Sequence, residues 1–269
     1  MTRRQVQRGN ILFLILLAVV LFAALSYAVT SSMRGGGKDA SAESAKSAAA
    51  SILNNATLMQ QAVNRLMLTN GCKESELSFE DAYDTGYVNN TRADGSCNLF
   101  LPQGGGLEYP VPDAGWLDSG WQSTYSAFYG KWLFFNNVCV IGVGTGSNSN
   151  CWNDGTSTDN DLVAYLPFVT QSVCKAINEG MGIPHMTSGD AQHMNGGAIA
   201  VSNAYKFKGT FGSSPTMHIW GSGGQYGGNS TAFLMQHQGC FRPTGNTDTF
   251  SANGQADGFY VFYQVLLAR

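Results

Sequence analysis

The feature that most constrains this chain is a long uncharged apolar stretch near its N-terminus. No Asp, Glu, Lys or Arg occurs between Gly9 and Met33, and the run from Ile11 to Val29 reads ILFLILLAVVLFAALSYAV. A helix rises about 1.5 Å per residue, so a run of this length matches the roughly 30 Å hydrocarbon core of a bilayer. The sequence therefore predicts a transmembrane helix over residues 10–34, preceded by a short cytoplasmic leader over residues 1–9.

Basic residues on either side of the run predict its orientation. Arg3, Arg4 and Arg8 precede it without an acidic residue, whereas Arg34 and Lys38 behind it are soon followed by acidic residues. Short segments rich in Lys and Arg stay in the cytoplasm. Because no second apolar run of comparable length follows, we expect a single-pass inner-membrane protein whose N-terminus is cytoplasmic and whose remaining chain is exported.

A cleaved secretory signal is the competing interpretation of this run. Signal peptides have apolar regions of roughly 7–15 residues that end in a small-x-small cleavage site. Here the run is longer, and the tripeptide Ala24-Leu25-Ser26 lies inside it rather than at its end. The length favours a helix that is not removed by signal peptidase.

Composition excludes several classes of protein. Of the 269 residues only 12% are charged, and 15 Lys+Arg against 18 Asp+Glu give a formal charge of −3. Without a long Lys/Arg stripe, this balance excludes a basic nucleic-acid-binding protein. An apolar content of 43% excludes a disordered chain, and 33 glycines favour turns and short strands.

Cysteine usage agrees with export. All six cysteines follow the apolar run: Cys72, Cys97, Cys139, Cys151, Cys174 and Cys240. In an oxidising compartment an even number implies disulfides, with 15 possible connectivities, and buried free thiols are the alternative for one or two of them. Nearest-neighbour pairing would give Cys72–Cys97, Cys139–Cys151 and Cys174–Cys240. The middle pair is the best supported, because the Gly/Ser/Asn-rich turn between its cysteines is typical of a hairpin.

Residues 41–70 have the pattern of an amphipathic helix. Apolar side chains recur at spacings of three and four: Ile52, Ala56, Met59, Val63 and Leu66. Gly71 follows in a C-cap position. Three glycines, Gly35 to Gly37, separate this helix from the apolar run, and each costs about 1 kcal/mol in a helix interior, so they predict a hinge. The expected segment of hinge and amphipathic helix is 35–71.

The chain from residue 72 to 269 is expected to form an exported, disulfide-stabilised antiparallel β-sheet domain. Runs rich in β-branched and aromatic residues occur at 130–144, 196–203, 215–223 and 258–268, with Gly, Asn, Asp and Pro between them. The last run is apolar almost throughout, which predicts a central buried strand. One further helix is expected between the N-cap Thr170 and Gly180. The overall class is therefore α+β.

This organisation resembles that of type IV pilins and pseudopilins. The matching stretch is QRGNILFLILLAVVLFAALSYAVTSS together with the amphipathic helix that ends near Asn70. The resemblance implies that a prepilin peptidase cuts after Gly9, so that the mature chain begins at an N-methylated Asn10. It also implies a structural subunit that leaves the membrane and assembles with copies of itself, or with other pilins, through its N-terminal helix. The filament would be extracellular, or a periplasmic pseudopilus.

Two positions depart from the pattern of that family. The fifth residue of the mature chain is usually a Glu, which neutralises the N-terminal amine of a neighbouring subunit, and here it is Leu14. The first mature residue is commonly apolar, and here it is Asn10. The chain therefore lacks the family's usual assembly contact, as do some minor pilins and tip-located pseudopilins.

Two parts of the chain carry residue types that bind metals. The oxygen-rich loop that contains Asp154, Asp159 and Asp161 could hold Ca²⁺, although it lacks the order of an EF-hand loop and a solvated Asx-turn loop is the simpler interpretation. Each of the four histidines (His185, His193, His218 and His237) has a Met within two positions, a donor set that suits copper. Their irregular spacing favours ordinary surface or hydrogen-bonded histidines, so no metal or other cofactor is expected.

No catalytic residue is predicted. The chain has no G-x-S-x-G, H-E-x-x-H or Walker loop, and Gly142-Val143-Gly144 opens a turn between strands rather than a helix. Five tryptophans lie among polar turns, which is typical of carbohydrate- or protein-binding loops; we expect Trp132 in the core and leave Trp116 and Trp121 open. The expected function is thus a non-enzymatic filament subunit. The alternative is a surface adhesin or binding protein with one membrane span that does not polymerise, and an exported hydrolase is a distant third.

Overall fold

The computed structural model describes residues 10–140, 142–144, 160–183, 193–195, 206–212, 217–219, 235–244 and 259–269. The chain forms two compact units, Met1–Ser44 and Ala45–Arg269, which are considered separately. The sequence run 196–203, which predicts a strand, lies outside the described residues.

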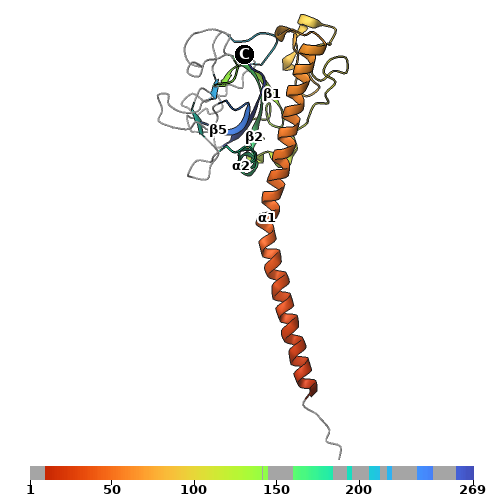
Figure 1. The fold of residues 1–269 in the computed structure, drawn as a ribbon, viewed down its shortest axis with the longest axis vertical. Coiled ribbons are helices and arrows are strands. Elements are labelled where there is room, and N and C mark those ends of the chain that lie inside the picture. Colours follow the sequence, from red (N-terminus) through yellow and green to blue (C-terminus); the bar gives the residue numbers. More distant parts are fainter. Residues whose placement is uncertain are drawn as a thin grey trace, which may run out of the picture. The chain divides into compact units, whose positions relative to one another are not determined.

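Helix α1 (Asn10–Thr69) accounts for the described part of the first unit and continues into the second. Its ribbon is uninterrupted (Figure 1), and the helical backbone includes Gly35 to Gly37. The glycines therefore do not interrupt the helical backbone, and the hinge itself stays a prediction. Helical hydrogen bonds join backbone groups and need no side chain, so glycine weakens a helix without preventing it.

In the second unit, α1 buries the apolar face that the sequence predicts. Ile52, Ala56, Met59 and Val63 are fully buried, and Leu66 is 1% exposed. The helix ends where Gly71 adopts a positive φ of 64°, a conformation that glycine reaches without strain. The Cys72 N–H donates to the carbonyl of Leu66 at 3.2 Å, which satisfies one of the carbonyls left free at the helix end.

A single sheet forms the centre of the second unit, with strand order β3-β5-β6-β2-β1-β4. Its strands are β1 (Leu133–Val140), β2 (Asp161–Val169), β3 (His193–Asn195), β4 (Met217–Ile219), β5 (Gln238–Thr244) and β6 (Tyr260–Leu267). The four central strands β5-β6-β2-β1 are antiparallel, as expected. The two three-residue strands at the edges, β3 and β4, pair in parallel with β5 and β1.

Both faces of the sheet are covered. Alternate residues such as Phe134, Ala164 and Phe262 belong to a core that also contains the buried face of α1 and of helix α2 (Gln171–Gly180). Their neighbours, such as Phe135 and Tyr165, belong to a second core on the opposite face, against which half-buried aromatic side chains from residues 121–129 pack. Every residue of β1 and β2 is consequently buried, which explains why the strands lack apolar–polar alternation.

Five short 3₁₀ helices lie between α1 and the sheet: η1 (Glu74–Glu76), η2 (Thr85–Tyr87), η3 (Asn90–Arg92), η4 (Ala114–Trp116) and η5 (Ser119–Trp121). Three of them begin with an Asp whose side chain accepts a hydrogen bond from a glycine N–H two residues later. These Asx-type caps explain how this long segment without strands keeps its backbone groups paired.

Several sequence predictions are confirmed here. Helix α2 begins after Thr170, whose hydroxyl accepts from the Val173 N–H at 3.4 Å, and β6 is a central buried strand. The disulfides Cys72–Cys97 and Cys174–Cys240 are present. Cys139 is also disulfide-bonded, whereas Cys151 lies outside the described residues, so that pairing stays a prediction.

Candidate functional sites

The first candidate is the apolar stretch of α1 from Phe13 to Tyr27. Its large apolar side chains are exposed by 48–77%: Phe13, Leu14, Ile15, Leu16, Leu17, Val19, Val20, Leu21, Phe22, Leu25 and Tyr27. Because consecutive positions point in different directions around a helix, these side chains cover every side of it. A helix that is apolar all round needs an apolar environment, which this unit by itself does not supply.

Among the described residues, no helix is long and apolar enough to cross a membrane. The described side chains of the predicted span 10–34 are those of residues 13–27. Gly9 lies outside the described residues, and Asn10 is the first residue of α1. The predicted processing site between them stays a prediction.

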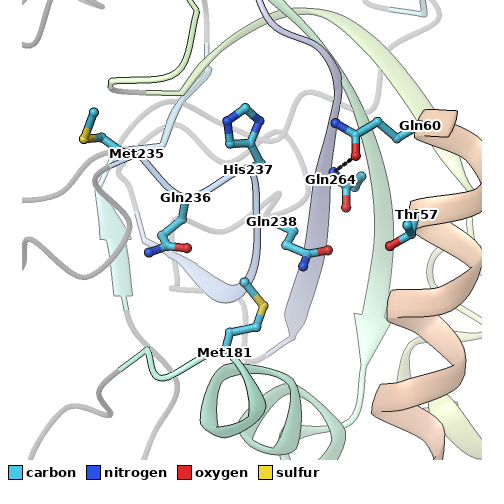
Figure 2. Close-up of a pocket in the computed structure, with 8 residues that line it drawn as sticks. All are labelled: Thr57, Gln60, Met181, Met235, Gln236, His237, Gln238 and Gln264. Carbon is cyan, nitrogen blue, oxygen red and sulfur yellow. Dashed lines mark hydrogen bonds between the residues drawn. The ribbon is translucent and has the colours of Figure 1, made fainter. Parts of the chain in front are cut away.

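The second candidate is an open pocket in the unit Ala45–Arg269, lined by side chains from α1, the end of α2, β6 and the segment that leads into β5 (Figure 2). It has a volume of about 400 Å³, and none of the described residues in its wall is Asp, Glu, Lys or Arg. Of the described lining side chains, four are glutamines, namely Gln60, Gln236, Gln238 and Gln264. The others are Thr57, Met181, Met235 and His237. The described wall of this amide-lined pocket can form hydrogen bonds but offers no fixed charge.

Gln264 is the most buried of the glutamines, with 2% of its surface exposed. Its Nε2 donates to the backbone carbonyl of Val265 at 2.9 Å and to Gln60 Oε1 at 3.4 Å. Since a backbone carbonyl can only accept, this contact determines which end of the Gln264 amide faces Val265. The Oε1 atom must therefore lie on the other side.

Two amide oxygens of this pocket are buried without a hydrogen-bond partner in the described structure, Gln264 Oε1 and Gln238 Oε1. The two residues are cross-strand neighbours on β6 and β5. A third oxygen, Thr57 Oγ1, donates its proton to the Leu53 carbonyl at 2.8 Å and keeps its lone pairs. A buried acceptor without a donor costs about 1–3 kcal/mol, so a ligand that donates to these two oxygens would offset that cost.

A buried ion pair lies elsewhere in the same unit. Lys206 Nζ contacts Asp84 Oδ2 at 2.5 Å, with side-chain exposures of 6% and 10%. The ammonium also lies 4.8 Å from the centre of the Tyr87 ring. Nearby, desolvation by burial raises the pKa of the Asp81 carboxyl above its usual range. Each buried charge thus has a partner of opposite sign, and the Tyr87 ring also lies over the ammonium. The pair ties the segment around η2 to the sheet.

The predicted metal residues are not brought together in the described part of the chain. Asp161 is 1% exposed at the start of β2, where its oxygens accept from the backbone N–H groups of Val140 and Arg269 at 2.9 and 3.0 Å. Asp154 and Asp159 lie outside the described residues. No group of three His, Cys, Asp or Glu in the described residues could hold a metal ion.

Of the histidines, only the side chain of His237 is described; His193 and His218 lie in β3 and β4, and His185 lies outside the described residues. His237 lines the amide-lined pocket with Met181 and Met235. Figure 2 shows the two thioether groups well apart, Met235 beyond Gln236 and Met181 at the opposite end. They do not share one donor set.

The tryptophans have different environments. Trp132 is fully buried, as expected, and its Nε1–H donates to the Pro110 carbonyl at 2.9 Å. Trp116 and Trp121 are half-buried and pack against the two cores, Trp121 beside Tyr125. Trp152 and Trp220 lie outside the described residues.

Sequence analysis missed the amide-lined pocket. Its residues come from positions 57–60, 181, 235–238 and 264, so no local pattern links them. The one available signal is Gln264 itself, a polar residue within the apolar run 258–268.

No protein-family model, curated protein or solved structure matches this chain. Its functional assignment therefore has to come from its own residues.

Proposed function

We propose that this chain is a structural subunit of an extracellular type IV pilus-like filament or pseudopilus, which assembles through its N-terminal helix. The observation that carries the proposal is the stretch Phe13–Tyr27, whose apolar side chains are exposed on every side of α1. Within a membrane, lipid tails would cover these side chains; within a filament, the equivalent helices of neighbouring subunits would do so.

The sequence supports a membrane stage before assembly. The apolar run extends beyond the described side chains on both sides, from Ile11 to Val29, and the flanking arginines favour a cytoplasmic N-terminus. Small residues such as Ala18, Ala23 and Ala24 permit close approach of helices in lipid or in a filament. Copies that repeat one heterologous contact without closing form an open helical assembly.

The unit Ala45–Arg269 supports a role outside the cytoplasm. Two disulfides cross it, which is typical of proteins that fold in an oxidising compartment. Its end of α1 is anchored by fully buried residues, so a domain of this kind would be displayed on a helix that it shares with the assembling segment. A pilin-like subunit requires both parts, a helical segment that assembles and a domain that is displayed.

The first experiment is the intact mass and N-terminal sequence of native protein from membrane and sheared-surface fractions. A mature chain that begins at Asn10, with an added methyl group, and that is recovered in sheared filaments is the expected result. A chain that begins at Met1 or Thr2 and stays in the membrane fraction would contradict processing and favour a permanently anchored surface protein.

A matched pair of variants tests the apolar stretch directly. Val20→Lys places a charge at the centre of the run, where it costs about 2.5–3.5 kcal/mol in a bilayer. We expect this variant to lose membrane recovery and filament yield. Gln61→Lys, at an exposed position of α1 in the second unit, is the control and should retain both. Equal filament yields from the two variants would argue against assembly through this helix.

A further inference from the structure

We infer that the amide-lined pocket binds a neutral polyhydroxylated ligand, one residue of a saccharide. The inference concerns only the unit Ala45–Arg269 and does not depend on filament assembly. It begins from the two buried amide oxygens, Gln238 Oε1 and Gln264 Oε1, which have no donor in the described structure.

The missing partners in this pocket are donors. Thr57 Oγ1 already donates to Leu53, so this hydroxyl can only accept from a ligand that does not displace that bond. Figure 2 shows Gln238, Gln264 and Thr57 around the same space. The nitrogen of the Gln264 amide contacts Gln60, and the oxygen of this amide points away from that contact. The terminal torsion of a glutamine is broad, so a modest rotation brings the oxygen of the half-buried Gln238 to a ligand, while the Gln264 amide keeps its two donor contacts.

Sugar hydroxyls fit this wall better than ionic ligands do. Each hydroxyl both donates and accepts, as each glutamine amide does, whereas carboxylates, phosphates and ammonium groups are bound by residues of opposite charge. In the part of the wall that the structure describes, the pocket has no Asp, Glu, Lys or Arg. Met181 at the end of α2 adds an apolar, polarisable surface for the C–H face of a sugar ring.

The size and origin of the wall also suit a small ligand. A volume of about 400 Å³ lies within the range of small-molecule pockets, roughly 300–1,000 Å³. Gln264 and Gln238 project from paired strands and Gln60 from a helix with a buried face, so rigid elements hold these three amides. The Gln264 amide, which two hydrogen bonds hold in place, loses little side-chain entropy on binding.

The test uses the full-length protein in a zwitterionic detergent that carries no sugar headgroup. Saturation-transfer NMR is recorded with glucose, galactose, mannose, N-acetylglucosamine and N-acetylgalactosamine, and with glucuronate as the anionic comparison. At least one neutral sugar should bind, and glucuronate should bind more weakly than glucose. Absence of transfer to all five neutral sugars, or a preference for glucuronate, would overturn the inference.

Variants then locate the binding. Gln238→Met and Gln264→Met keep the side-chain length and remove the buried amide, and each should weaken binding of the sugar by about tenfold. Gln61→Met, which removes an exposed amide next to Gln60, should leave binding unchanged. Thermal midpoints are measured in parallel to detect folding defects. Because Gln238 is only half-buried, the Gln238→Met variant still tests the site if Gln264→Met fails to fold. Undiminished binding in both pocket variants would exclude this site.

Discussion

The contact between Lys206 and Asp84 shows how much one pair of residues can contribute in this protein. The two residues are 122 positions apart, and both side chains are almost completely buried. Removing one member leaves an uncompensated buried charge, whereas removing both charges does not.

We expect Lys206→Met to lower the free energy of unfolding by about 3–5 kcal/mol. Asp84→Asn added to this variant should restore part of the loss, because an Asn still accepts the Gly86 N–H bond that Asp84 accepts at 2.8 Å. Lys175→Met is the control: its ion pair with Glu179 is half-exposed and should be worth less than about 1 kcal/mol. Urea denaturation measures all three, and equal losses from Lys206→Met and Lys175→Met would contradict the argument.

Asp81 makes stability depend on pH. Burial raises its pKa in the folded protein above the unfolded value, so the folded state binds more protons between the two pKa values. The stability from this group is present below the unfolded pKa and is lost as the pH rises through the folded pKa. We therefore expect Asp81→Asn to be more stable than the wild type at pH 7, with the difference closing in acid. Thermal midpoints measured from pH 3 to pH 7 test this, and a constant difference would refute it.

At the scale of an element, α1 combines two kinds of surface in one helix. From Phe13 to Tyr27 its apolar side chains are exposed, whereas between Ala45 and Leu66 one face is buried in the core. The hydrophobic spacing predicts the buried face, because residues three and four positions apart share one side of a helix.

Substitutions at Met59 and Leu68 compare a buried and an exposed position of α1. Met59 is fully buried, so Met59→Ala leaves a cavity and should cost about 2–5 kcal/mol of unfolding free energy. Leu68 is 86% exposed, so Leu68→Ala should change it by less than about 0.5 kcal/mol. Chemical denaturation provides both values. Similar losses for the two variants would mean that the end of α1 does not pack as described.

At the scale of the whole molecule, disulfides stabilise a unit that has long segments without strands. Cys174–Cys240 joins α2 to β5 across a sequence separation of 66, and Cys72–Cys97 ties the end of α1 to the following segment across 25. Asn178 reinforces the first connection, because its side chain exchanges two hydrogen bonds with the backbone of Cys240 at 2.7 and 2.9 Å.

Loop-closure entropy predicts the ranking of the two disulfides. Replacing both cysteines of the 66-residue pair by Ala should cost about 4 kcal/mol of unfolding free energy, and the same change in the 25-residue pair about 3.5 kcal/mol. Loss of packing adds to the cost in both pairs, because all four cysteines are buried. Denaturation of the two double variants measures it, and the reverse order would show that unfolded-chain entropy does not dominate.

The amino-acid sequence by itself determined the features that depend on neighbours along the chain. These are the uncharged run, the buried face of the helix up to Leu66, the cap at Thr170, the turn at Gly71 and the nearest-neighbour cysteine pairs 72–97 and 174–240. Each follows from helix periodicity, from backbone preference or from short loop closure, and none needs a distant partner.

Only the tertiary structure decided the rest. The sequence did not predict strands β2 and β5. Strand β2 contains Asp161 and Pro167, and β5 contains Pro243, which are residue types with low strand propensity. Pairing with β6 overrides these local preferences. The helical backbone through Gly35 to Gly37 likewise contradicts local propensity. The buried ion pair and the amide-lined pocket join residues from distant parts of the chain, and such contacts exist only after the sheet has formed, because burial and pairing are properties of the packed elements.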